Sequence, residues 1–325
     1  DNYLSTRGNL NNDIGVPLTL FRLEAHHRAA VIEMGMNHPG EIARLTEIAE
    51  PTVGLVNNAQ REHQEFMASV AAVAEENSAV IRGLGDAGAA IFPGDEEYTA
   101  LWQGYANNRK VCSFGLSPSC DISARWQAED FGSRITISAP DTQFEVRLSA
   151  AGVHNVRNAL AASAAAMAVG IDAASIARGL ERFSPVAGRL QRKTAANGAL
   201  VIDDTYNANP DSVRAAIDVL AAAPAPRTLV LGDMGEVGSE GVAFHEEIGA
   251  YAHAHRIDHL FTLGTLARHA TRAFGQGAVH FDDMDKLTAE ITGVPASASI
   301  LVKGSRFMQM ERVVNHLTGQ PTGGH

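Results

Sequence analysis

The stretch "VIDDTYNANPDS", residues 201–212, runs from an apolar strand into the start of a helix. Its "NPD" at 209–211 predicts the helix start, because asparagine caps a helix, proline suits the first helical position and aspartate favours the first turn. Capping does not account for the polar side chains just before it, Asp204, Tyr206 and Asn207. A carboxylate at the end of a buried strand can accept hydrogen bonds from a ribose or hold a hydrated cation.

The alternation of strand and helix continues from this stretch to the C-terminus. The apolar runs that precede helical patterns lie at 199–204, 227–233, 258–264, 278–281 and 299–305, and the last helical pattern spans 306–317. Strands that each feed a helix form a parallel sheet, so we expect a doubly wound, Rossmann-like domain. Ligands of such sheets bind beyond the carboxyl ends of the strands, which singles out the loops after residues 204, 233 and 303.

The first half of the chain has the same α/β character with one change of pattern. Apolar runs at 29–35, 52–58 and 89–94 alternate with helical patterns, at 40–48 and 69–83, and predict parallel strands. Four closely spaced strand patterns between 110 and 150 predict an antiparallel patch appended to this sheet. The Pro, Gly and basic residues of "SPVAGRLQRK" (184–193) mark the boundary, giving domains 1–188 and 189–325.

Composition excludes several classes of protein. The 325 residues carry a net charge of −11, which argues against a nucleic-acid-binding surface. Two cysteines give no disulfide or metal framework and indicate a reducing compartment, the cytoplasm. The most apolar window, 159–171, is too short and too rich in alanine to span a bilayer, so we expect no membrane insertion.

Two strand ends in the first half carry candidate metal or phosphate ligands. Glu33 ends an apolar strand, where a carboxylate needs a partner. The sequence allows two partners equally, a magnesium ion or a basic side chain. Asn57 and Asn58 end another strand, and His63 follows. A lone histidine is usually structural, but a carboxylate and an imidazole after neighbouring strands favour a shared metal or phosphate site.

Three further motifs offer groups suited to a nucleotide. "AGVHNVRNALAA" (151–162) puts His154 and Asn155 at a helix start, with Asn158 on the same face as Asn155. Carboxamides suit the edge of a purine, although for this motif taken alone a helix cap plus a solvated asparagine is the better explanation. Arg189 in "AGRLQRK" lies between the two α/β series, a position from which an arginine can reach a phosphate across a domain cleft. In "VKGSRF" (302–307) two basic side chains and main-chain amides meet at a helix start, a ready anion site.

Seven motifs, in order, resemble the landmarks of the Mur ligase family of ATP-dependent amide ligases that build peptidoglycan. They span essentially the whole chain: "TRGNLNNDIGVPLTL", "EMGMNHPGEIA", "GVHNVRNALAA", "GRL", "DDTYNANPDS", "LGDMGEVG" and "LVKGSR". The resemblance implies a central ATP-binding domain, a C-terminal ligand-binding domain, ATP with Mg²⁺, an acyl-phosphate intermediate and a cytoplasmic monomer. "GNLNN" and "TYNANP" favour the branch that adds D-alanyl-D-alanine to a nucleotide-sugar tripeptide. A ligase for another amino acid and a non-catalytic remnant that binds nucleotide or peptide are the alternatives.

The resemblance also implies a role for individual residues. The implied catalytic residues are Glu33, His63 and Arg189, the first two as magnesium ligands. The implied nucleotide contacts are His154, Asn155 and Asn158 at adenine, Arg189 at phosphate and Asp204 at ribose. The implied substrate-binding residues are Asn9, Asn12, Asn207, Lys303 and Arg306.

The chain departs from the family pattern at two points. The family's phosphate loop ends in Gly-Lys-Thr, and no Gly-Lys pair occurs here, so we expect an incomplete central domain, an N-terminally truncated fragment and no activity by the chain alone. The family lysine that forms a carbamate aligns with Asn77, which predicts a weaker second magnesium site. Substitution by Glu75 or Glu76, and a harmless subfamily variation, are the other interpretations.

Overall fold

The computed structural model describes residues 2–61 and 65–320, and the chain separates into two compact units. The first unit comprises Asp1–Trp126, Ile135–Val146 and Val156–Leu180. The second comprises Gln127–Arg134, Arg147–Asn155 and Glu181–His325. Among the described residues, no helix combines the length and the apolar character needed to cross a membrane.

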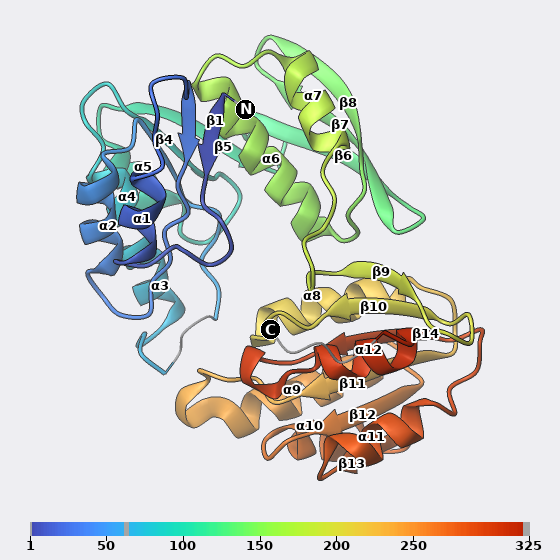
Figure 1. The fold of residues 1–325 in the computed structure, drawn as a ribbon. Helices are drawn as coiled ribbons and strands as arrows, with labels where there is room; N and C mark the ends of the chain where they lie inside the picture. Colours follow the sequence, from blue (N-terminus) through green and yellow to red (C-terminus); the bar gives the residue numbers. More distant parts are fainter. Residues whose placement is uncertain (1, 62–64, 321–325) are drawn as a thin grey trace. The chain divides into compact units, whose positions relative to one another are not determined.

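The second unit is built on a six-stranded sheet in the order β13-β12-β11-β14-β10-β9 (Figure 1). Its parallel strands are β10 (Leu200–Asp204), β11 (Arg227–Gly232), β12 (His259–Leu263), β13 (Ala278–Phe281) and β14 (Ser299–Lys303). These confirm the five predicted strands. β9 (Gln191–Thr194) pairs antiparallel with β10 and was not predicted, because its Gln-Arg-Lys-Thr sequence has no apolar alternation.

Helices cover both faces of this sheet (Figure 1). Leu229 and Leu231 share one core with α8 (Pro210–Ala221), α9 (Gly241–Ala254) and α10 (Ala267–Phe274). Val230, between them on β11, shares the other core with α11 (Met284–Ile291) and α12 (Glu311–Thr318). Successive side chains of a strand point to opposite faces, so one apolar run feeds two cores and the domain is doubly wound. Two 3₁₀ turns, η1 (Gly238–Glu240) and η2 (Arg306–Met308), lie in the loops.

The other six-stranded sheet has the order β3-β4-β5-β6-β7-β8. Strands β3 (Val53–Leu55), β4 (Ala89–Pro93), β5 (Lys110–Gly115) and β6 (Ile122–Glu129) are parallel. β7 (Gly132–Ala139) and β8 (Thr142–Leu148) follow β6 after two-residue turns, a connection that only antiparallel neighbours allow. The expected parallel sheet is therefore present, but the antiparallel patch is smaller than predicted. Of the four strands expected in it, β5 and β6 extend the parallel sheet, and only β7 and β8 reverse direction.

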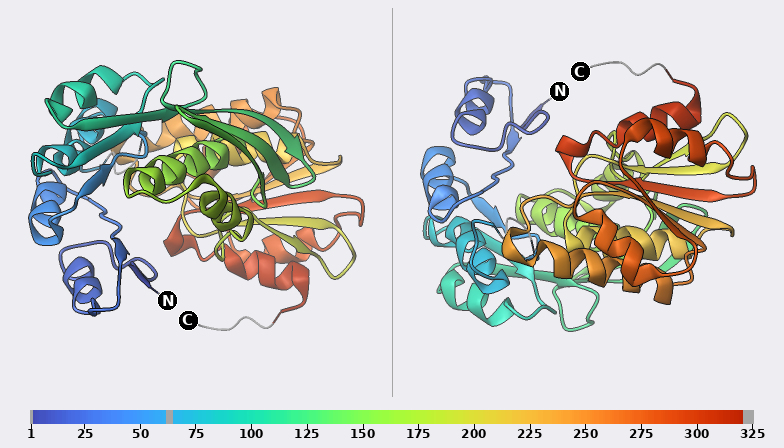
Figure 2. Two further views of the ribbon diagram at one scale, coloured as in Figure 1. Left: turned by 90° about the horizontal axis from the view of Figure 1, so that it is seen from above. Right: turned by 90° about the horizontal axis from the view of Figure 1, so that it is seen from below.

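The N-terminal strands do not join that sheet. β1 (Tyr3–Ser5) and β2 (Ala29–Val31) form a two-stranded parallel sheet of their own, shown in dark blue in Figure 2, so β2 is shorter than the predicted run 29–35. The helices that precede β9 in the chain are α1 (Gly15–Leu20), α2 (Glu41–Ala49), α3 (Val70–Asn77), α4 (Ala79–Arg82), α5 (Thr99–Ala106), α6 (Val153–Ala168) and α7 (Ala173–Glu181). The predicted helix 69–83 is interrupted at Ser78, whose hydroxyl donates to the carbonyl oxygen of Glu75.

Candidate functional site

The loops after β10, β11 and β14 meet at the carboxyl edge of the second unit's sheet. Ser305 joins all three. Its N–H donates to the carbonyl oxygen of Asp233 at 3.0 Å, and its Oγ accepts from the N–H of Gly235 at 2.6 Å. The same hydroxyl donates to the carbonyl oxygen of Ala208 at 3.2 Å. A single side chain thus aligns the three polar loops predicted from the sequence.

Asp204 and Lys303 form a buried ion pair within this cluster. Their side chains are 12% and 3% exposed, and the Lys303 amine also donates to the carbonyl oxygen of Asn207 at 2.9 Å. The other carboxylate oxygen of Asp204 accepts from the N–H of Leu190 at 3.1 Å. Two charges that leave water together are stable only when they neutralise each other and are hydrogen-bonded, which is the case here.

The neighbouring residues of the stretch 201–212 shape the loop. Asp203 pairs with Lys193 of β9 at 2.7 Å and accepts from the Thr205 hydroxyl at 2.7 Å. Asn209 accepts from the N–H of Ser212 at 2.8 Å, and its own N–H donates to the Ser212 hydroxyl at 3.0 Å. This reciprocal capping box confirms the predicted helix start.

Arg189 is fixed beside the same loop by a turn. The N–H of Tyr206 donates to the carbonyl oxygen of Gly188 at 3.0 Å, and the Arg189 guanidinium carbon lies 4.3 Å from the centre of the Tyr206 ring. Gly188 has a φ of +72°, and a side chain there would approach the Tyr206 nitrogen to 3.0 Å, so the turn requires glycine. Arg306 pairs instead with Glu311 at 2.9 Å.

His154, at the start of α6, contains an unsatisfied buried group. Its Nε2 accepts from the amide of Asn155 at 3.1 Å, and that amide also donates to the carbonyl oxygen of Ala151 at 2.8 Å. Burial lowers the pKa of His154; the nearby Lys303 lowers it further and Asp204 opposes the shift. The neutral ring assigned by this network carries its proton on Nδ1, which has no partner in the described structure. A buried donor without an acceptor costs about 1–3 kcal/mol, which a ring nitrogen of a ligand would offset.

In the first unit Glu33 is exposed and bound by neutral groups. Its Oε1 accepts from the Asn11 amide at 2.9 Å, and its N–H donates to the Thr6 hydroxyl at 2.9 Å. Within the described residues no basic side chain pairs with it, so the basic-partner alternative has no support there. His63 lies outside the described residues. No group of three or more potential metal-binding side chains occurs among the residues that are described.

The remaining predicted asparagines of this unit have local contacts. The Asn12 side chain accepts from the N–H of Gly15 at 2.9 Å and so helps to begin α1. Asn9 is exposed, and its carbonyl oxygen accepts from the N–H of Asn11 at 2.8 Å. Asn158 accepts from the amide of Asn57 at 3.0 Å, which connects the strand-end asparagine to α6.

Asn77 and the two acids before it have separate partners. The Asn77 amide donates to the carbonyl oxygen of Asn58 at 3.1 Å. Glu76 is 7% exposed and accepts from the N–H groups of Gly40 at 2.8 Å and Ile42 at 2.9 Å, so it caps α2. Glu75 accepts from a tyrosine hydroxyl at 2.8 Å. Sequence reasoning missed the Glu76 cap; the available signal was that α2 begins at a glycine with no capping side chain of its own.

Two buried residues that hold the loop after β11, Asp233 in the loop and His245 on α9, were also missed. Asp233 accepts from the N–H groups of Leu266 at 2.9 Å and Ala267 at 2.7 Å, and therefore caps α10. His245 donates from Nδ1 to the carbonyl oxygen of Gly241 at 2.6 Å and accepts at Nε2 from the N–H of Met234 at 3.0 Å. Burial lowers the pKa of His245. These two residues hold the loop that carries Gly235.

Two family models match the chain. The Mur ligase middle domain matches residues 1–166, and the Mur ligase, glutamate ligase domain matches residues 188–306. The UDP-N-acetylmuramoyl-tripeptide–D-alanyl-D-alanine ligase of Escherichia coli (strain K12) is 41% identical over 97% of this chain and 71% of that relative. The chain belongs to the Mur ligase family. The family predicted from the seven motifs is thereby confirmed.

Solved structures of Mur ligases confirm the fold class. MurF from Acinetobacter baumannii superposes with a TM-score of 0.93 at 34% identity, over 98% of this chain and 71% of that one. MurF from Thermotoga maritima, solved in complex with ADP, gives a TM-score of 0.87 at 25% identity, over 98% of this chain and 74% of that one.

Proposed function

We propose that this Mur ligase joins D-alanyl-D-alanine to UDP-N-acetylmuramoyl-tripeptide in the synthesis of a peptidoglycan precursor. The observation that carries the proposal is the 41% identity, over 97% of the chain, to a ligase of that name. The terminal carboxylate of the tripeptide takes the γ-phosphoryl group of ATP and releases ADP. The amine of the dipeptide then attacks the acyl phosphate, an amide bond forms, and phosphate leaves with its bonding electron pair.

The residues present fit magnesium and ATP. Magnesium keeps several waters and takes one or two carboxylates, and Oε2 of the exposed Glu33 makes no hydrogen bond within the described structure. The unsatisfied Nδ1 of His154 suits a purine acceptor. When bound, magnesium-ATP supplies the phosphoryl group and neutralises part of its charge.

The chain's own residues are proposed to bind and orient these groups. Glu33 and His63 hold the ion, and Arg189, kept in place by Tyr206, binds phosphate. His154, Asn155 and Asn158 contact adenine, and Asp204 contacts ribose. The proposed substrate-binding residues are Asn9, Asn12, Asn207, Lys303 and Arg306. Since Lys303 is paired with Asp204, we propose that it also positions the 204–207 loop.

The proposed domains are 1–188 and 189–325, and the proposed form is a cytoplasmic monomer. Because no Gly-Lys pair occurs in the chain, we propose that these 325 residues alone do not release phosphate. Turnover then requires a polypeptide that also supplies such a loop.

Phosphate release from ATP tests the function. The full-length gene product, with the nucleotide-sugar tripeptide, should depend on D-alanyl-D-alanine. Equal turnover with a single amino acid would refute the proposed substrate, and ADP binding without any phosphate release would favour a non-catalytic remnant. Arg189→Ala should lower kcat by about 100-fold, as for loss of one transition-state donor, whereas the exposed Arg312→Ala should not.

A further inference from the structure

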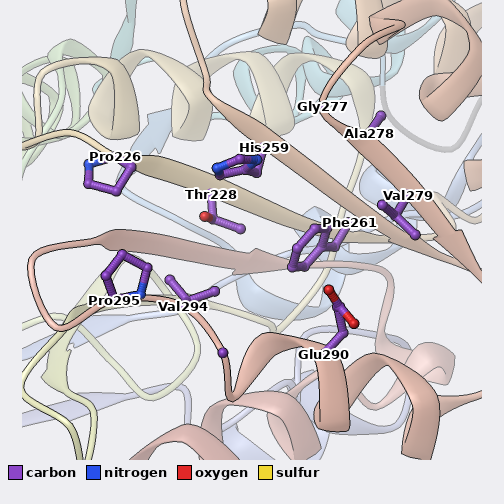
Figure 3. A pocket seen from close by; sticks show the side chains of 11 residues that line it. Pro226, Thr228, His259, Phe261, Gly277, Ala278, Val279, Glu290, Val294 and Pro295 are labelled. Carbon is purple, nitrogen blue, oxygen red and sulfur yellow. The ribbon is translucent and has the colours of Figure 1, made fainter.

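A pocket of about 370 Å³ opens at the amino edge of the second unit's sheet (Figure 3). Its lining comes from the first residues of β11, β12 and β13 and from the connection between α11 and β14. The ligase residues Asp204 and Lys303 end their strands at the opposite, carboxyl edge. The pocket is therefore separate from the proposed ligase site, and its volume is in the range of small-molecule sites.

The wall of this amino-edge pocket is an aromatic surface held in place. Phe261 is 8% exposed and packs edge-on against Phe281, with ring centres 5.7 Å apart. On its other side the ring of His259 lies 6.4 Å away at a tilt of 35°. Figure 3 shows Val294 across from these side chains. A ring that enters the pocket thus meets a fixed aromatic face and an aliphatic one.

Thr228, at the base of the pocket, has a hydrogen-bonding group without a partner. The residue is 0% exposed, and its Oγ1 makes no hydrogen bond in the described structure. Other buried hydroxyls of the same sheet are satisfied: Ser299 donates to the carbonyl oxygen of Pro224 at 2.7 Å, and Thr262 bonds to Thr271 at 2.6 Å. An unpaired buried hydroxyl is unusual, and a ligand atom is one way to satisfy it.

Glu290 supplies the only carboxylate of the lining. It is exposed and forms no ion pair among the residues that are described. His259 is the other ionisable group of the lining. A carboxylate beside an aromatic face favours a positive group on a ring and disfavours phosphates and carboxylates.

We propose that this pocket binds a small aromatic cation. Its ring lies against Phe261, its polar edge faces Thr228, and its positive group faces Glu290. The site is independent of the proposed ligase function.

Benzamidine, an aromatic amidinium ion, is a direct probe of the site. Binding to the full chain is measured by NMR shift changes, with neutral benzamide and anionic benzoate as isosteric comparisons. We expect the affinity to fall in the order benzamidine, benzamide, benzoate, with NMR shift changes confined to residues around Phe261. Equal binding of all three, binding elsewhere, or no binding of benzamidine would overturn the proposal.

Two variants separate the contacts. Glu290→Gln should weaken the binding of benzamidine about tenfold, the effect of one charge-assisted contact, and leave the affinity for benzamide unchanged. Glu240→Gln, an exposed glutamate in the loop before α9, is the matched control and should change neither. Thr228→Val should weaken the binding of both benzamidine and benzamide several-fold. It should also raise the Tm of the free protein, because it removes the unpaired hydroxyl. Identical affinities for Glu290→Gln and Glu240→Gln would contradict the assigned charge contact.

Discussion

Replacing Lys303 by methionine removes the charge that pairs with Asp204 inside the second unit. The Asp204 side chain is 12% exposed, so its carboxylate cannot recover full hydration. Among the described residues, the Leu190 N–H at 3.1 Å is the one main-chain donor left to it. Breaking one side of a buried pair costs about 3–5 kcal/mol. We expect the lower end, roughly 3 kcal/mol, because some exposure remains; this corresponds to a fall in Tm of roughly 6–12 °C.

Thermal unfolding of the chain at pH 7, followed by circular dichroism and calorimetry, measures this loss. The matched control is Lys286→Met, since that amine is 68% exposed and pairs with Asp283 at 3.0 Å in solvent. Its Tm should equal that of the wild type. The double variant Asp204→Asn/Lys303→Met should recover part of the loss because no unpaired charge remains. A Lys303→Met protein that melts with the wild type would refute the buried pair.

Three other changes have defined outcomes. Burial raises the pKa of Asp95, but Arg157 and two main-chain N–H groups hold it below its ordinary value; Arg157→Met should therefore raise this pKa in an NMR titration and lower the Tm. Burial lowers the pKa of His245, so as the pH falls below about 6.5 this histidine is protonated in the unfolded chain before it is protonated in the folded one. The free energy of unfolding therefore decreases as the pH falls from about 6.5 to the lowered pKa of the folded state, and His245→Gln should flatten that part of the denaturation profile. In a polypeptide that also supplies the phosphate loop, Glu33→Gln should raise the magnesium concentration for half-maximal phosphate release by about tenfold or more.

Each of these changes has a matched control in the chain. Arg134→Met breaks an exposed pair with Glu129 and should leave the Asp95 titration unchanged. His253→Gln alters an exposed histidine of the same helix as His245 and should keep the wild-type slope. Glu47→Gln, on the surface of α2, should not affect magnesium dependence. A control that behaves like its partner variant would contradict the corresponding contact.

The elements of the second unit were largely predictable, because its apolar strands are short and continuous and alternate with helices. The helix start at Asn209 followed from local chemistry alone, and the structure confirms its capping box. The sequence pattern predicts that the last helix begins at residue 306, but α12 begins at Glu311. The reason is local geometry: residues 306–308 form a 3₁₀ turn, and Gln309 has a φ of +50° that no α-helix accommodates.

The partners of the candidate site residues were not predictable. Asp203 and Asp204 are adjacent on β10 and point to opposite faces, so one sequence motif serves two structural roles. Asp203 meets Lys193 of β9, a strand without an apolar pattern, and Asp204 meets Lys303 of β14. Nothing in the motif itself distinguishes the two carboxylates.

The sequence by itself determined the family, the alternation of strands and helices and the capped helix start, because these depend on motif order, apolar periodicity and contacts within a few residues. Only the tertiary structure decided that Lys303 neutralises Asp204 and that Glu76 caps α2. It also decided that Nδ1 of His154 and Oγ1 of Thr228 are buried with no partner in the part of the chain that the structure describes. These contacts join residues far apart in the chain. They depend on strand order and on side-chain packing across a whole layer, which no local pattern encodes.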